Sequence, residues 1–445
     1  MKKLMAAVYV ATALASNVSD TAGAHSPVTS EEQPLAERYL DPVAGLTLEE
    51  AITAGLEREP GLLAARTDVE SASGMVGQAE LRPNPSVSVM RQEQISGADN
   101  MTIAEVEVPL ELFRRKSRVA AAELAREAAT HSVSDRERML AAEIRSAYGD
   151  LAAAARDLQV SDDLVDATRR SYELLVARVE EGAAPPLEKN MVEVELRRIE
   201  SHRLLQAGRA EAALIELKRL LAVELQETVR VRSTLDALVQ GEAVELSRGD
   251  VATAVSNRPD VLEAEASLRL AEARIEEAGS QGRFDMSLFG SYTRMDFSFP
   301  QTAFGPSGDL EPIQDIFHNV AAGAKVTVPV RNANEGAIAA ARAERAGAEY
   351  RRRARVLAAV ADVAAAMAQD EHAQRAVAIY ASGARELARQ NLEVVRQAYE
   401  LGRSSLSDVL DEQRRYLEVE MGYTEALQTA FDARTALRRS LGEMQ

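Results

Sequence analysis

Apolar residues recur at alternating steps of three and four in two stretches of the chain, which is the spacing of a coiled-coil seam. The seam positions are Val165, Thr168, Tyr172, Leu175 and Val179 in one stretch, and Ala388, Leu392, Val395, Tyr399 and Gly402 in the other. No proline lies between Pro109 and Pro185, and none follows Pro329. A continuous helix from about Arg114 to Glu181 would be on the order of 100 Å long at ~1.5 Å per residue. The pattern predicts helical rods, which three glycines should weaken locally: Gly149, Gly347 and Gly383.

The chain repeats itself, which predicts two units of the same layout. Pro60 corresponds to Pro259, 199 residues later, and Gly182 corresponds to Gly402, 220 residues later. We therefore divide the chain into repeat 1, residues 46–240, and repeat 2, residues 241–445. Repeat 2 gains its extra residues around Phe297 to Phe317. That stretch contains prolines and glycines typical of an exposed outer loop: Pro300, Gly305, Pro306, Gly308 and Pro312.

The N-terminus has the pattern of a cleavable secretory signal peptide. Lys2 and Lys3 precede an apolar run from Leu4 to Ala15, and small residues end in Ala22-Gly23-Ala24. We predict cleavage after Ala24, so residues 1–24 are the signal and residues 25–45 an N-terminal linker. The apolar run is too short to be a membrane-spanning helix.

Four segments alternate between polar and apolar residues, as β-strands with two different faces do. The apolar members include Val87, Val89, Met286, Leu288, Tyr292, Ala324, Val326 and Val328, and the polar members include Ser86, Ser88, Ser287, Ser291, Thr293, Lys325 and Thr327. The same pattern suits a soluble sandwich or a membrane barrel with a wet interior. The rods and the export signal favour the barrel. Four strands cannot close one, since roughly eight are needed, so we expect several copies to assemble.

Composition and charge narrow the classes of function further. The 445 residues include no cysteine, which excludes disulfides, thiolate metal sites and a lipid on an N-terminal cysteine. The formal net charge of −18 does not favour a nucleic-acid partner. It suits passage of cations, although solvated helix surfaces explain it better.

These features together resemble the TolC outer-membrane efflux family, from about Leu46 to Gly442. The segment Tyr399–Asp411 follows the family run Y-x-x-G-x-x-S/T-x-x-D-V-L-D, and Asn257-Arg258-Pro259-Asp260 opens repeat 2 in the family's manner. The resemblance implies a mixed α/β membrane protein and a homotrimer. Long helices would form a periplasmic α-barrel, and four strands from each protomer would form a twelve-stranded barrel in outer-membrane lipid.

The resemblance also implies where partners bind. The turns at Gly182 and Gly402 would be periplasmic tips that meet an adaptor protein and an inner-membrane pump. The predicted docking residues are Gly182, Pro186, Glu188, Gly402, Arg403, Ser404 and Leu406. Asp408 and Asp411 would line the closed periplasmic aperture. Their spacing of three places them on one helix face, and three copies would surround a constriction with six carboxylates. The spacing alone is also that of a solvated face near a helix N-terminus.

Shorter segments resemble channels that serve cobalt–zinc–cadmium or copper–silver pumps of the RND type. They are Pro109-Leu110-Glu111-Leu112, Pro186-Leu187-Glu188 and the run from Pro329 to Gly336. Arg331 stands where those channels have phenylalanine, and Phe113-Arg114-Arg115 replaces a glycine-rich segment.

The sequence contains no pattern of catalytic residues that would indicate an enzyme. It has no phosphate-binding or nucleophile motif, and its five histidines are scattered, so we expect no metal site and no cofactor. We predict a passive exit duct of a tripartite efflux pump, with heavy-metal cations as cargo. The alternatives are a duct for organic drugs or exported proteins and, least favoured, a periplasmic coiled-coil scaffold without a pore.

Overall fold

The computed structural model describes residues 35–95, 97, 99–240 and 248–443. All of them belong to one compact unit, Pro34–Gln445. The predicted signal peptide and the first part of the predicted linker lie outside the described residues. The rest of that linker is packed: Ala36 and Tyr39 are buried, and backbone bridges join Leu40 and Leu46 to Val231.

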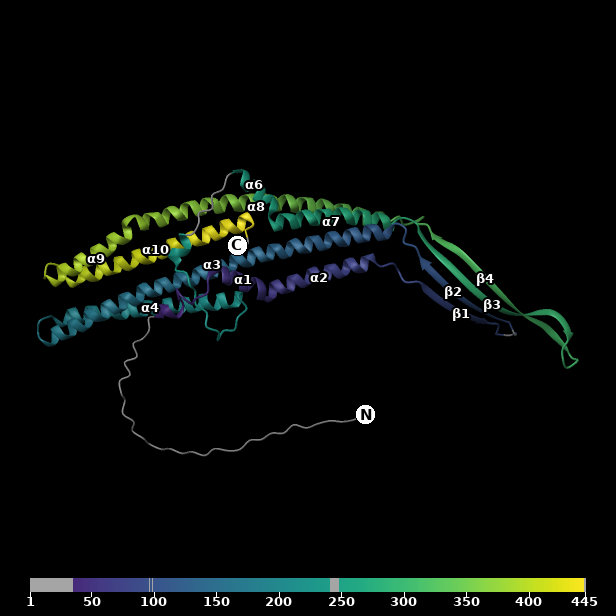
Figure 1. The fold of residues 1–445 in the computed structure, drawn as a ribbon, viewed down its shortest axis with the longest axis horizontal. Helices are drawn as coiled ribbons and strands as arrows, with labels where there is room; N and C mark the ends of the chain where they lie inside the picture. Colours follow the sequence, from purple (N-terminus) through teal and green to yellow (C-terminus); the bar gives the residue numbers. More distant parts are fainter. Residues whose placement is uncertain (1–34, 96, 98, 241–247, 444–445) are drawn as a thin grey trace, which may run out of the picture. The chain divides into compact units, whose positions relative to one another are not determined.

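Within this unit, long helices lie side by side and a four-stranded sheet continues from one end of them (Figure 1). The first half contains η1 (Leu35–Arg38), α1 (Leu48–Arg58), α2 (Pro60–Glu80), β1 (Ser86–Glu93), β2 (Asn100–Pro109), α3 (Arg114–Glu180), α4 (Pro186–Leu220) and α5 (Leu235–Val239). The second contains α6 (Arg248–Asn257), α7 (Pro259–Gln281), β3 (Asp285–Phe304), β4 (Leu310–Thr327), α8 (Glu335–Ile379), η2 (Tyr380–Ala384), α9 (Arg385–Glu400) and α10 (Leu406–Leu441). Apart from η1 and α5 in the first half and the interruption at η2 in the second, the two halves have the same order of elements.

The predicted rod of repeat 1 is confirmed, because α3 runs unbroken over 67 residues. It packs against α2, α4, α7 and α10. Gly149 does not weaken it: a Cβ there would lie 2.4 Å from the Phe431 ring, so glycine is what lets α10 approach closely. Among the described residues, no helix is both long and apolar enough to cross a membrane.

The corresponding rod of repeat 2 is interrupted. The chain passes from α8 through the π-helical turn η2 into α9, and Gly383 there has φ 146° and ψ −17°. Only glycine adopts such a conformation without strain. Gly347, by contrast, lies inside an intact part of α8. Of the three glycines predicted to weaken the rods, only Gly383 breaks a helix.

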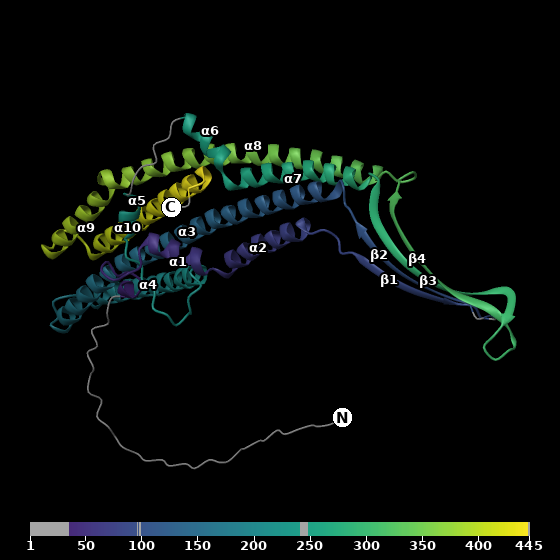
Figure 2. The ribbon, with the colours of Figure 1, turned by 45° about the vertical axis from the view of Figure 1, so that its right-hand side comes forward.

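The sheet is antiparallel with the order β1-β2-β3-β4, so β1 and β4 are its edges (Figure 2). Its register divides the side chains between two faces as predicted. The apolar face carries Val87, Val89, Val106, Val108, Leu288, Tyr292, Val320 and Val326. The other face is mainly polar and carries Ser86, Ser88, Glu105, Glu107, Ser287, Ser291, Thr293, Asn319 and Lys325, together with the apolar Met90, Ile103 and Phe289. On this face Ser287 donates a hydrogen bond to Glu107.

The prediction of an outer loop over Phe297 to Phe317 is wrong. β3 continues to Phe304 and β4 begins at Leu310, so most of this stretch is a long β-hairpin with its turn at residues 305–309. The register of the β3–β4 pairing shifts between Ser298 and Thr302, and Pro300 lies within this irregular stretch. A bulge and free ribbon edges tolerate proline without a ladder hydrogen bond, which is why the loop signals did not prevent strand formation.

Candidate functional site at the hairpin tips

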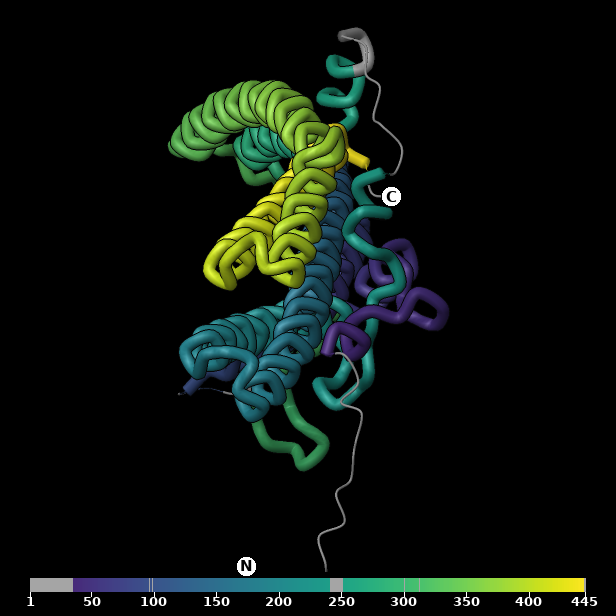
Figure 3. Tube along the Cα trace, turned by 90° about the vertical axis from the view of Figure 1, so that its left-hand side faces the viewer, coloured from purple at the N-terminus to yellow at the C-terminus, as the bar shows by residue number. Residues whose placement is uncertain are grey.

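Helices α3 and α4 form one hairpin, and α9 and α10 form another, seen as two pairs of coils in Figure 3. Both hairpins turn in the same way. Gly182 has φ 73° and Gly402 has φ 70°, the left-handed conformation that glycine favours at helix ends. In each turn the glycine N–H donates three residues back, Gly182 to Val179 and Gly402 to Tyr399. The two predicted tips thus share one backbone geometry.

The helix that leaves each tip begins differently in the two hairpins. Helix α4 begins with Pro185 and Pro186, and its start has no side-chain cap. Helix α10 begins with a capping box, in which Ser405 Oγ accepts from the Asp408 N–H at 3.2 Å and Asp408 Oδ2 accepts from the Ser405 N–H at 2.9 Å. Ser404 also donates to Asp408 at 3.0 Å. These hydrogen bonds hold the pKa of Asp408 below its ordinary value.

Asp408 and Asp411, the predicted aperture residues, lie on the exposed part of α10. Asp411 is 3.3 Å from Arg414, which also contacts the buried carboxylate of Glu195 on α4 at 3.0 Å. Asp408, besides its predicted role at the aperture, caps the start of its own helix. The arrangement of the two side chains around an axis stays a prediction.

Two polar contacts connect the tips of the two hairpins. The Tyr399 hydroxyl donates to Glu188 at 2.8 Å, and burial followed by that contact raises the pKa of Tyr399 to about 12. Glu195 is only 1% exposed and accepts from Arg198 and Arg414. Burial alone would raise the pKa of Glu195, but the two arginines outweigh it and hold the pKa below its ordinary value.

Apolar contacts accompany these polar ones. Leu406 and Leu410 of α10 pack with Leu175 of α3 and Val192 of α4. Leu406 is 8% exposed, and its side chain joins the two hairpins within the protomer. Its predicted role as a docking residue stays a prediction. Gly182, Pro186, Gly402 and Arg403 are exposed at the tips, whereas Glu188 and Ser404 are half-buried.

Each hairpin also has an exposed apolar stripe that was not predicted from the sequence. Leu187 and Val194 lie on α4, seven residues apart, and both are about two-thirds exposed. Leu387, Val394 and Leu401 lie on and just after α9 at the same interval, each at least 60% exposed. The heptad interval beside each turn glycine was the available signal. The two seams recognised from the sequence are the ones that face inward.

A buried ionic cluster lies where repeat 2 is interrupted. Glu420 of α10 is 3% exposed and accepts from Arg156 of α3 at 2.8 Å and from Arg385 of α9 at 3.0 Å. Both guanidinium groups lie over the ring of Tyr423, whose hydroxyl donates to Asp236 at 2.8 Å. The cluster joins α3, α5, α9 and α10 beside the break.

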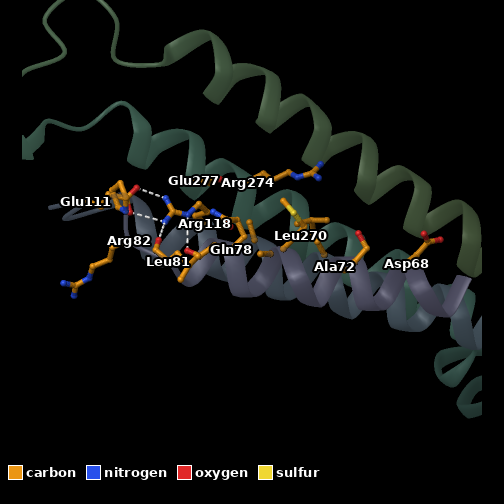
Figure 4. Close-up of a pocket in the computed structure, with 17 residues that line it drawn as sticks. Asp68, Ala72, Gln78, Leu81, Arg82, Glu111, Arg118, Leu270, Arg274 and Glu277 are labelled. Atoms are coloured by element: carbon orange, nitrogen blue, oxygen red, sulfur yellow. Dashed lines mark hydrogen bonds and ion pairs between the residues drawn. The ribbon is translucent and has the colours of Figure 1, made fainter. Parts of the chain in front are cut away.

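At the other end of the helices, an open groove of about 770 Å³ lies between α2, α3 and α7 (Figure 4). Arg118 crosses it, donating to both carboxylate oxygens of Glu111 and to the carbonyls of Ala79 and Leu81. Glu111 has a positive φ of 42°, so Arg118 fixes the corner between β2 and α3. In the part of the chain that the structure describes, no three potential ligands are grouped to hold a metal ion.

Comparisons with known proteins agree with this architecture. The family model described as outer membrane efflux protein matches residues 51–223 and again residues 251–443. The cobalt-zinc-cadmium resistance protein CzcC of Cupriavidus metallidurans is 22% identical over 407 residues, which cover 89% of this chain and 90% of that protein.

Solved structures show the same fold. CusC, described in work on folding and transmembrane channel formation, superposes with a TM-score of 0.72 at 17% identity, over 89% of this chain and 92% of its own. The open state of the MtrE outer membrane channel of Neisseria gonorrhoeae gives a TM-score of 0.72 at 20% identity, over 89% of each chain.

The family match covers both halves of the chain, and the matched residues include the sheet and both hairpin tips. It confirms the predicted TolC-like fold and the outer-membrane location. The chain belongs to the outer membrane efflux protein family.

Proposed function

We propose that this protein is the passive exit duct of a tripartite efflux system, built as a homotrimer in the outer membrane. The observation that carries the proposal is the four-stranded sheet with one apolar face, one polar face and two unpaired edges. Exposed strand edges and an apolar face must be covered. Further copies cover both at once, with lipid against the apolar face and water against the polar face.

Three copies would supply twelve strands, enough to enclose an open lumen where eight give a filled one. The helices would extend that lumen into the periplasm. The proposal includes the division of the chain into repeats 46–240 and 241–445, each of which would contribute one hairpin to the tunnel wall.

The apolar stripes on α4 and α9 support closure of the tunnel between copies. α4 leads away from a tip and α9 leads toward one, so Leu187 and Leu401 both lie beside a turn. Val194 and Val394 each lie seven residues further, about 10 Å along their helices. We infer that α4 of one copy packs against α9 of the next, with these residues in antiparallel register.

The tips would be the sites of regulation and docking. Asp408 and Asp411 from the copies would form a ring of carboxylates at the periplasmic aperture, which favours cations. A periplasmic adaptor would dock on the exposed tip positions Gly182, Pro186, Gly402 and Arg403 with the flanking Glu188 and Ser404, and an inner-membrane pump of the RND type would supply the energy. The Tyr399–Glu188 and Arg414–Glu195 contacts would keep the tips closed.

Heavy-metal cations are the proposed cargo, supported by the likeness to a cobalt-zinc-cadmium resistance protein and by the tip segments. The test is growth of a deletion strain across zinc, cobalt, cadmium, copper and silver, beside detergents and antibiotics. Sensitivity to metals that the intact gene reverses supports the proposal. Sensitivity confined to organic compounds would keep the duct and reject the metal cargo.

Conduction through a lipid bilayer tests the aperture directly. Asp408→Asn together with Asp411→Asn should weaken cation selectivity and the block by multivalent cations, because the ring would lose its charge. Glu418→Gln, an exposed change on the same helix, is the matched control. Unchanged selectivity and block in the double variant would exclude these aspartates from the aperture.

A further inference from the structure

The β3–β4 hairpin continues beyond the other two strands. The last residues paired across all four strands are Glu93, Asn100, Asp296 and Ile316. From Phe297 onward, β3 pairs with no residue of β2, and among the described residues only the Ser298 N–H is held from that side, by Asp99 of the β1–β2 turn at 2.7 Å. A two-stranded ribbon without further partners is only marginally stable. Its side chains therefore indicate what else the ribbon contacts.

The apolar face of the sheet ends just below this extension. Its highest apolar pair is Tyr292 and Val320, and the next row across the sheet is polar: Arg91, Thr102, Arg294 and His318. A row of charged and hydrogen-bonding residues at the end of an apolar band is typical of the membrane surface. Residues 297–315 therefore lie outside the lipid if the sheet spans the membrane as proposed.

In the extension, the side that is mainly polar in the sheet becomes mainly apolar. On the side that is polar in the sheet, the ribbon carries an apolar group: Met295, Phe297, Phe299, Ile313 and Phe317. The Phe299 and Phe317 rings meet edge to face with centroids 6.0 Å apart. The opposite side, which is apolar in the sheet, carries Ser298, Thr302 and Gln314, and Gln314 donates to Asp296 at 2.6 Å. Ile316 lies on this side too, and so do Phe304 and Leu310 beside the turn.

The apolar group on the inward side of the ribbon has a direct physical meaning. Above the membrane the outward side meets water, so its polar residues need no further partner. The inward side carries phenylalanines that remain 37–39% exposed in the protomer. Clustered exposed aromatics on a soluble extension mark a contact surface, and what lies inward of each ribbon in a trimeric duct is the ribbons of the other copies.

The backbone of the β3–β4 extension is also bent, which would let it approach a neighbouring copy. The irregular register between Ser298 and Thr302 acts as a bulge, which bends a ribbon, and Figures 1 and 2 show the end of the hairpin turning away from the line of the strands. Asp315 and Glu311 share the inward side but lie on β4. A contact made through Phe297 and Phe299 of β3 leaves those carboxylates at its edge, in water.

We propose that the inward faces of the β3–β4 extensions of neighbouring copies pack together, forming an apolar constriction at the outer mouth of the duct. This rests on the proposed function, because it requires the duct to be an oligomer in the outer membrane. Apolar constrictions exclude water and small ions when closed. The duct would thus be closed at its outer end by aromatic contact, independently of the carboxylates at the periplasmic end.

The absence of cysteine from the chain makes the test simple. Phe299→Cys places a thiol on the inward side, and Thr302→Cys places one at a similar level on the outward side. Each variant of the full chain is oxidised in isolated outer membranes with copper phenanthroline and air. We expect at least five times more covalently linked dimer from Phe299→Cys than from Thr302→Cys.

A second measurement uses a bulky, membrane-impermeant maleimide on whole cells. We expect rapid labelling of Thr302→Cys and at least fivefold slower labelling of Phe299→Cys. Equal cross-linking and equal labelling of both variants, in a protein that still forms outer-membrane trimers, would overturn the constriction alone. Failure of the unsubstituted chain to form oligomers in the outer membrane would instead overturn the proposed function.

Discussion

The two helical hairpins have the same turn but differ in stiffness. The first is built on α3, which is unbroken for 67 residues. The second is interrupted at η2, where Gly383 leaves helical geometry, and resumes as α9 for 16 residues before its tip. A continuous helix transmits force along its length, whereas a break with a glycine is a hinge. The comparison indicates that the second hairpin can bend while the first holds the wall.

The break is not loosely packed, which explains how a hinge coexists with a defined structure. Glu420, Arg156 and Arg385 pair beside it, and the Tyr380 and Tyr423 rings lie 6.0 Å apart. The same cluster ties the second hairpin to α3. Bending would have to rearrange these contacts, so we expect them to determine how readily the hairpin moves.

Among these substitutions, loss of the buried Glu420 carboxylate should lower the free energy of unfolding the most. Glu420→Ala leaves the Arg156 and Arg385 guanidinium groups without their shared partner, and breaking a buried ion pair from one side costs about 3 kcal/mol or more. We expect that decrease in the free energy of unfolding, measured by chemical denaturation in detergent. The exposed neighbour Glu418→Ala should change it by less than about 0.5 kcal/mol. Similar values for the two variants would mean that the cluster does not stabilise the break.

The hinge itself can be tested with one substitution made at two places. Gly383→Ala puts a Cβ on a residue with φ 146°, so we expect a loss of about 1–3 kcal/mol. Gly347→Ala lies in the intact part of α8 and should raise stability by up to about 1 kcal/mol. Opposite signs in thermal unfolding support the comparison. A stabilising effect at both glycines would show that the second hairpin prefers to be straight.

Much of this architecture was readable from the sequence, because proline positions and heptad spacing report directly on long helices. The Arg114–Glu180 helix and both turn glycines follow from such local signals. The break at Gly383 does not, since Gly149 and Gly347 have the same intrinsic weakness and remain helical. What distinguishes them is tertiary: Gly149 accommodates Phe431, whereas Gly383 has open space around it and lies two residues before Arg385 of the ionic cluster.

The site was predicted only in part for the same reason. The Tyr399 and Glu188 segments stood out as motifs, but their hydrogen bond joins residues 211 positions apart. The hairpin at 297–317 was missed because its prolines and glycines indicate turns, while strand pairing depends on a partner strand. The burial of Leu406 likewise depends on α3 and α4.

The interface between the two hairpins should respond to pH. Burial, followed by repulsion from Asp150 of α3, raises the pKa of Asp432 on α10 to about 6. An acid with a raised pKa in the folded protein stabilises it below the unfolded value of 3.8, and this is lost as the pH rises through about 6. Asp432→Asn should therefore stabilise the protein by about 1 kcal/mol at pH 7.5 and hardly at all at pH 4. Glu425→Gln, exposed on the same helix, controls for net charge, and an equal gain at both pH values would contradict this cause.

The smallest energetic change should have the most specific consequence. Tyr399→Phe removes only the hydroxyl that donates to Glu188 of the other hairpin, worth about 1 kcal/mol. If this contact holds the bending hairpin against the rigid one, its loss should raise the population of open channels about fivefold. We expect to see this as a higher frequency of channel opening in lipid bilayers. Tyr172→Phe, whose hydroxyl reaches Glu193 within the first hairpin at 3.4 Å, should leave opening unchanged. A Tyr399→Phe channel that opens no more often than the Tyr172→Phe channel would mean that the tip contact stabilises the fold without controlling the duct. The break at Gly383 would then have to be restrained by the Glu420 cluster alone.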